Sequence, residues 1–148
     1  HDALPIYKLA IAGLKETKKR IKSFLLPSLN KAASALVTIM TNGVIRSIQM
    51  LDDFSVRADG KRVDLFSGSE QAVINIALRI ALGQVLTHKV FSVVIGDELD
   101  ASMDANRTGL LWQALANLVK SGSIEQVVLV SHEDEPVEIE NLKHINFT

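Results

Sequence analysis

The chain has 148 residues, of which 47% are hydrophobic, and this is enough for one globular domain with a real core. It contains no cysteine, which excludes disulfides and thiolate metal sites. No uninterrupted apolar run approaches the roughly 20 residues of a membrane span, so we expect no membrane partner. The net charge is −1, but the charges are unevenly distributed along the chain. Residues 1–31 contain seven Lys or Arg residues and only two acids, whereas ten of the 17 acids lie from Asp97 onward. This asymmetry favours a polyanion-facing end and a metal-facing end, or simply a solvated basic helix.

The first part of the chain has two helical patterns. Residues 4–26 carry a thin apolar stripe near heptad a and d positions, typical of the end of a coiled coil or of a plain surface helix. Pro27 is expected to break or kink this helix. A second helix is predicted from Ser28 to about Met40, with Asn42 and Gly43 as its stop signal.

A β-rich stretch follows. Residues 44–51 and 54–58 are predicted strands, and Asp59-Gly60 is a hairpin turn signal before Lys61. The sequence therefore predicts a small antiparallel unit, in which no chemistry is evident.

A long helix is predicted to begin at Ser67 and to run to about Leu86. Ser67 and Glu70 have the spacing of a capping box. Most of this helix is apolar, which predicts burial, with one polar stripe formed by Gln71, Asn75 and Arg79. Its exposed amino end would favour an anion such as a phosphate, although capping alone also explains Ser67 and Glu70.

An apolar run at residues 91–96 ends in two adjacent carboxylates, Asp97 and Glu98. A continuous apolar run predicts a parallel strand covered on both faces, with the carboxylates at the ligand-binding edge. One carboxylate could hold a divalent metal and the other could orient a water, or the pair is only an acidic turn. A helix at 105–120 leads to a second strand at 126–130, so His132 is expected beside the carboxylates.

Three ordered motifs carry a family resemblance: Ser67 to Gln71, Val93 to Glu98 with Ala101 to Asp104, and Val130 to His132. Their order resembles the signature motif, Walker B strand, D-loop and switch histidine of an ABC-type ATPase head. The flanking residues resemble the SbcC-type ATPases of double-strand-break repair, which are related to the structural-maintenance-of-chromosomes proteins. The likeness covers about Asn30 to Thr148. It implies an α/β fold, the C-terminal lobe of a P-loop (ABC-type) head, with parallel strands, flanking helices, a small antiparallel β unit and an N-terminal coiled-coil root.

The resemblance also implies cofactors and residue roles. ATP and Mg²⁺ would be the cofactors, with Asp97 taking part in magnesium coordination and Glu98 polarising the attacking water. His132 would contact the γ-phosphate. The signature residues would bind nucleotide held by the opposite head, and they are Ser67, Gly68, Ser69 and Glu70. The D-loop residues Ser102 and Asp104 would reach across the dimer, and Arg79 would couple nucleotide state to the arm.

Several positions depart from the family pattern. Ser69 replaces the second signature glycine, where a side chain could crowd the phosphate or add a hydroxyl donor. Gly96 replaces a bulky apolar residue before Asp97, Leu99 stands where glycine or proline is commoner, and Met103 replaces the D-loop leucine. No G-x-x-x-x-G-K-S/T loop occurs in the sequence. We therefore expect half of a head: residues 1–29 as the base of a coiled-coil arm and 30–148 as the C-terminal lobe.

The expected function is that of the ATP-binding and hydrolysing subunit of a DNA repair nuclease complex. Its partners would be the N-terminal Walker A half, a second head, a nuclease subunit and DNA, in the cytoplasm, at the nucleoid or in a virus-infected host cell. One alternative is a chromosome-tethering or recombination-mediator head without a nuclease. Another is an unrelated metal-dependent hydrolase acting alone through Asp97, Glu98 and His132.

Overall fold

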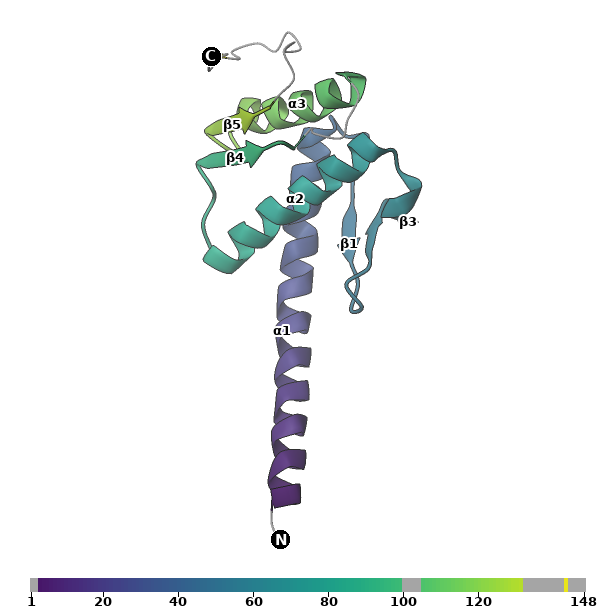
Figure 1. Cartoon of the computed structure of the whole chain (residues 1–148), viewed down its shortest axis with the longest axis vertical. Helices are drawn as coiled ribbons and strands as arrows, with labels where there is room; N and C mark the ends of the chain where they lie inside the picture. The colour runs from purple at the N-terminus through teal and green to yellow at the C-terminus, as the bar shows by residue number, and fades with distance from the viewer. Residues whose placement is uncertain (1–2, 100–104, 132–142, 144–148) are drawn as a thin grey trace.

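A computed structural model describes residues 3–99, 105–131 and 143. A long helix, α1, forms a stem, and the other elements gather around its C-terminal end (Figure 1). Helix α2 crosses the stem near its C-terminal end, and a small antiparallel sheet lies beside the stem (Figure 1). Helix α3 and strands β4 and β5 lie together at the C-terminal end of the stem. The helical N-terminal region and the two kinds of sheet confirm the fold class expected from the sequence.

Helix α1 is a single helix, Ala3–Met40, with Pro27 inside it. The predicted break at Pro27 is therefore wrong. The reason is tertiary: Leu26 and Leu29, on either side of the proline, are both buried, so packing holds the helix together where local propensity would end it. The predicted stop is confirmed, because Asn42 and Gly43 have positive φ and the Gly43 amide donates to Thr38 O at 2.8 Å.

The two halves of α1 differ in exposure. Up to Phe24 its described apolar side chains are exposed, whereas Leu29, Ala33, Val37 and Met40 lie in the core. By length and composition alone, Pro5–Met40 could cross a membrane, a test that core helices of soluble proteins also pass. The C-terminal half of α1 packs against α2, α3 and β1, so the core accounts for the apolar residues of that half.

The antiparallel unit is confirmed, with shorter strands than predicted. Strands β1 (Ile48–Met50), β2 (Val56–Ala58) and β3 (Lys61–Arg62) pair in that order. Asp59 and Gly60 both have positive φ, as the turn signal requires. A short 3₁₀ helix, η1 (Val63–Leu65), then leads to α2.

Helix α2 spans Gly68–Thr87 and supplies much of the core. Ser67 is its N-cap, and His88 ends it in the left-handed conformation. Asn75 and Arg79 of the predicted polar stripe are exposed, and Gln71 is half-buried. The predicted helix and its start are confirmed.

Strands β4 (Val93–Asp97) and β5 (Gln126–Val130) are parallel neighbours, joined through helix α3 (Ala105–Lys120). Val93 pairs with Gln126 and Asp97 with Val130. Burial on both faces, which the apolar runs predicted, is wrong for this chain. Val94, Val127 and Leu129 face the core, but Val93, Ile95, Val128 and Val130 are exposed, with Ile95 74% exposed. One face of the sheet is therefore open.

Candidate functional site

The carboxylate pair lies at the carboxyl edge of the parallel strands, as predicted. Asp97 is the last residue of β4, and the Glu98 amide donates to Val130 O at 2.9 Å. Both side chains are exposed. Glu98 has φ +48°, an uncommon conformation for a residue other than glycine, asparagine or aspartate, so the strand ends on a strained residue at the candidate catalytic position.

The chemistry of this edge fits a magnesium ion only in part. Mg²⁺ is usually held by one or two carboxylates and keeps several waters, so Asp97 is a suitable oxygen ligand. Within the described ranges, no group of three His, Asp or Glu residues could enclose a metal. His132, Ser102 and Asp104 lie outside the described residues, so their predicted positions remain predictions. The described edge can thus take part in a metal site that other groups complete.

Two departures from the family pattern, Gly96 and Leu99, compensate for each other. Gly96 is buried in β4, and a Cβ at this position would lie 2.9 Å from Leu99 Cγ and 3.0 Å from Leu129 Cδ2. Such distances are shorter than normal van der Waals contacts, so the side chains of Leu99 and Leu129 would have to move. The Leu99 side chain therefore occupies the space that a bulky residue 96 would fill.

The amino end of α2 has the full capping box. Glu70 Oε2 accepts from the Ser67 amide at 2.8 Å and from the Ser67 hydroxyl at 2.7 Å, and the Glu70 amide lies 3.4 Å from Ser67 Oγ. Ser67 and Gly68 are exposed. The helix start is therefore pre-formed, with an exposed hydroxyl and the positive end of the helix dipole.

Ser69 does not project from the exposed surface of this helix end. Its side chain is only 3% exposed, and its Oγ lies 3.2 Å from Ser67 Oγ. A buried hydroxyl next to Ser67 can hold that side chain in place, whereas a side chain facing solvent could obstruct a ligand. The Ser69 hydroxyl thus contacts Ser67, and whether its side chain crowds a phosphate or adds a donor, the two possibilities that the sequence left open, stays a prediction.

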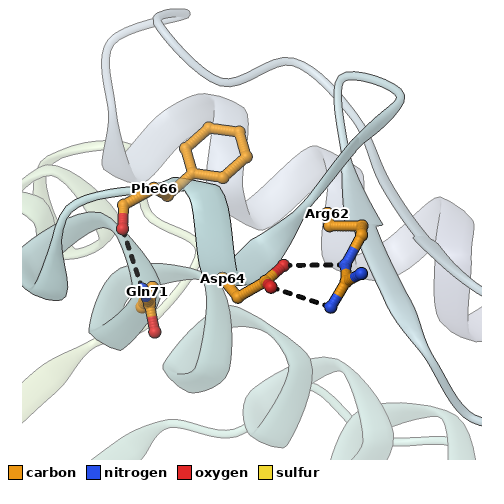
Figure 2. A network of polar contacts seen from close by, with 4 residues as sticks. All are labelled: Arg62, Asp64, Phe66 and Gln71. Atoms are coloured by element: carbon orange, nitrogen blue, oxygen red, sulfur yellow. Dashed lines mark hydrogen bonds and ion pairs between the residues drawn. The ribbon is translucent and has the colours of Figure 1, made fainter.

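Sequence reasoning missed the contacts that hold the segment before α2. Figure 2 shows Arg62 and Asp64 as a two-pronged ion pair, with Nε–Oδ1 at 3.0 Å and Nη2–Oδ2 at 2.8 Å. It also shows Gln71 Nε2 donating to Phe66 O at 2.8 Å. The only sign in the sequence that Gln71 matters is its position inside the signature-like motif. The Gln71 bond links the residue before Ser67 to the first turn of α2, whereas the exposed Arg62–Asp64 pair contributes little to stability.

Two shallow cavities among the described residues lie elsewhere. A shallow one of about 610 Å³ is lined by Thr38, Asn117 and neighbours at the C-terminal ends of α1 and α3. A second, of about 360 Å³, is lined by lysines of α1 together with Ser23 and Asp52. Neither includes the serines of α2 or the carboxylates of β4. The candidate site is therefore two surface features on different elements.

Solved structures define the class of this fold. An SMC head bound to the C-terminal winged-helix domain of ScpA aligns with a TM-score of 0.52 at 21% identity, covering 83% of this chain and 40% of that one. A structure from work on ATP-driven dimerisation and DNA-stimulated activation of SMC ATPases aligns with a TM-score of 0.54 at 21% identity. The alignment covers 79% of this chain and 74% of that one. The fold is that of an SMC-type ATPase head.

Curated relatives narrow this class. The Rad50 ATPase of double-strand-break repair from Thermoplasma volcanium is 30% identical over 139 residues, covering 85% of this chain and 15% of that protein. The Methanococcus maripaludis Rad50 ATPase is 30% identical over 88 residues, covering 60% and 8%. The chain thus spans only a small share of these relatives, and no protein-family model matches it. It is identified as the C-terminal part of an ATPase head of the SbcC, Rad50 and SMC type, as the motifs predicted.

Proposed function

We propose that this chain is the C-terminal lobe of an ATP-hydrolysing head in a DNA double-strand-break repair complex, with residues 1–29 as the base of its arm. The observation that carries the proposal is the Asp97-Glu98 pair at the carboxyl edge of two parallel strands, in a chain similar to Rad50 ATPases. Phosphoryl transfer needs mainly positioning and charge stabilisation, which such an edge and a helix amino end can supply.

The residue roles follow from position. Asp97 would bind Mg²⁺ through water, and Glu98 would orient and deprotonate the attacking water, helped by His132 at the γ-phosphate. Ser67, Gly68 and Glu70 would form the surface that receives the nucleotide of a second head, and the buried Ser69 would support the Ser67 hydroxyl. Their capping box already exists, so little would need to reorganise on binding. Ser102 and Asp104 would contact the second head, and the exposed Arg79 would report nucleotide state to the arm.

The open face of the parallel sheet supports the need for an N-terminal half. Val93, Ile95, Val128 and Val130 form an uncovered apolar face next to the carboxylates. Burying a large apolar side chain contributes about 1.5–3 kcal/mol, so covering four partly exposed ones gives several kcal/mol towards docking. We propose that the Walker A half, which would cradle the α- and β-phosphates, covers this face.

DNA contact is proposed on the basic side of α1. Lys15, Lys18, Lys19 and Lys22 line one shallow groove, a suitable surface for phosphodiester oxygens. Binding through these lysines must weaken as salt rises. An affinity that stays constant between low and high salt would exclude phosphate contacts at this groove.

The decisive experiment joins this chain with its Walker A half and measures ATP hydrolysis and dimerisation. Glu98→Gln should retain ATP binding, abolish hydrolysis and trap the head dimer, while Leu110→Ala, on an exposed site of α3, should behave like the wild type. Normal turnover by Glu98→Gln would refute the assignment. Magnesium-dependent hydrolysis by this chain alone would instead favour a stand-alone hydrolase. Co-purification of a nuclease through residues 4–26 would separate a repair head from a chromosome-tethering one.

A further inference from the structure

Helix α1 contains a weak point near the place where it leaves the core. Pro27 has no N–H to donate to the Ser23 carbonyl, and its ring crowds the preceding turn. Sharp helix bends occur mainly at such positions. On the N-terminal side of Pro27, packing reaches no further than the buried Leu26 and the half-buried Leu25, since Phe24 and Ile21 are both exposed. Without further support, the stem is expected to bend here.

On the C-terminal side of Pro27, α1 is joined to the outer edge of β1. Asn30 donates to Met50 O at 3.2 Å and accepts from the Met50 amide at 2.8 Å. Ser34 Oγ does the same with Ile48, at 3.2 and 2.9 Å. Two helical side chains thus supply the hydrogen bonds that a neighbouring strand would otherwise make.

The register of this contact has a geometric basis. Four residues of helix rise about 6.0 Å, and two residues of strand rise about 6.6 Å, so successive i+4 side chains meet alternate strand residues. Thr38 continues the series, with Oγ1 3.2 Å from Arg46 O. We call Asn30, Ser34 and Thr38 the polar ladder. The ladder fixes the β1–β2 hairpin parallel to the helix axis, and Figure 1 shows the hairpin lying alongside α1.

On the N-terminal side of Pro27, the hairpin tip contacts the same helix. Lys22 Nζ donates to Asp52 O and lies 4.4 Å from the centre of the Phe54 ring. Phe54 has φ +64°, where glycine or asparagine would be usual, and its side chain is 58% exposed. A bulky residue held in a strained, exposed turn calls for a role beyond the turn itself, and the Lys22 contact provides one.

We propose that the β1–β2 hairpin is a splint across a latent hinge at Pro27. The polar ladder anchors the hairpin to the core side of the proline, and Lys22 with Asp52 and Phe54 ties its tip to the stem side. Loss of the tip contact lets the stem bend at Pro27. This device sets the direction in which the stem leaves the core, and it holds whether or not the chain takes part in ATP hydrolysis.

The test measures the direction of the stem in solution. The chain has no cysteine, so spin labels can be attached at Lys8→Cys and Asn75→Cys, which are both exposed positions. Double electron–electron resonance then measures one distance between the stem and the core. Phe54→Ala or Lys22→Met should broaden and shift the distance distribution. Adding Pro27→Ala should restore the narrow distribution, because the helix then regains its missing hydrogen bond. Leu65→Ala, at a likewise exposed apolar residue away from the hairpin tip, should leave the distance distribution unchanged.

A second measurement tests the anchor independently. Asn30→Ala should speed hydrogen exchange of the Met50 amide roughly two- to tenfold, the loss expected for one hydrogen bond, and leave core amides of α3 unchanged. Unchanged distance distributions in both Phe54→Ala and Lys22→Met would overturn the splint. So would broadening that persists after Pro27→Ala, since the bend would then lie elsewhere. Circular dichroism identifies any variant that fails to fold, and the remaining tip variant then decides.

Discussion

Gly96 and Leu99 should be energetically coupled, because their side-chain positions compete for one space. Gly96→Ala places a Cβ against Leu99 Cγ and Leu129 Cδ2 at 2.9 and 3.0 Å. Overpacking of this kind destabilises by about 1–3 kcal/mol. Leu99→Ala removes a half-buried side chain, which costs about 1–2 kcal/mol of apolar burial. In the double variant the new methyl enters the space that Leu99 leaves, so we expect a coupling energy of about 1 kcal/mol or more.

The assay is urea unfolding of the four proteins of this cycle, followed by circular dichroism. Each kcal/mol should also shift Tm by about 2–4 °C for a chain of this size. Gly13→Ala is the matched control, because a Cβ at Gly13 has no atom within 4 Å and an alanine in a helix interior is favourable by about 0.5–1 kcal/mol. Additive effects within about 0.5 kcal/mol, or a stabilising Gly96→Ala, would refute the compensation between the two residues.

Three further changes test other features. Ser69→Ala should weaken ATP-dependent dimerisation of the assembled head by roughly threefold or more, as measured by analytical ultracentrifugation. Tighter dimerisation of Ser69→Gly would instead show that the Ser69 side chain obstructs the nucleotide. Ser55 donates two hydrogen bonds to Asp53, and these hold the pKa of the Asp53 carboxyl below its ordinary value. The contribution of these bonds to the stability of the hairpin tip should be complete above the ordinary pKa of an aspartate and be lost as the pH falls through the lowered pKa, which NMR titration of the carboxyl group measures. Ile95→Asp should leave this chain folded but abolish docking of the Walker A half, whereas Val94→Asp, on the face that packs against the core, should unfold the chain. Docking of Ile95→Asp as tight as that of the wild type would contradict the role of the open face.

The elements that were predicted correctly are those with local signals. The capping box of Ser67 and Glu70, the Asp59-Gly60 turn and the stop at Asn42-Gly43 each depend on residues within a few positions of one another, and each occurs as expected. The parallel pairing of β4 with β5 also followed from two apolar runs separated by a helix. Local backbone preferences and pattern were sufficient for these.

The features that were not predicted depend on distant residues. Continuity of α1 through Pro27 requires the packing of Leu26 and Leu29, and the polar ladder joins residues that are 14 and 20 positions apart. The burial of the parallel strands was overestimated because an apolar run does not show which of its faces the chain itself covers, and the described residues cover only one. At the candidate site, Asp97, Glu98 and Ser67 were found from motif and position, but their roles await the experiments above.

The two sheets also differ in what their edges allow. An unpaired strand edge is a template for another chain, and proteins usually block it. The polar ladder occupies the outer backbone groups of β1, so the antiparallel sheet is closed on that side. Among the described residues, β4 and β5 pair only with each other. In the proposed assembly, a further strand would add to the sheet that bears Asp97, because the β1 edge of the other sheet is already occupied by the stem.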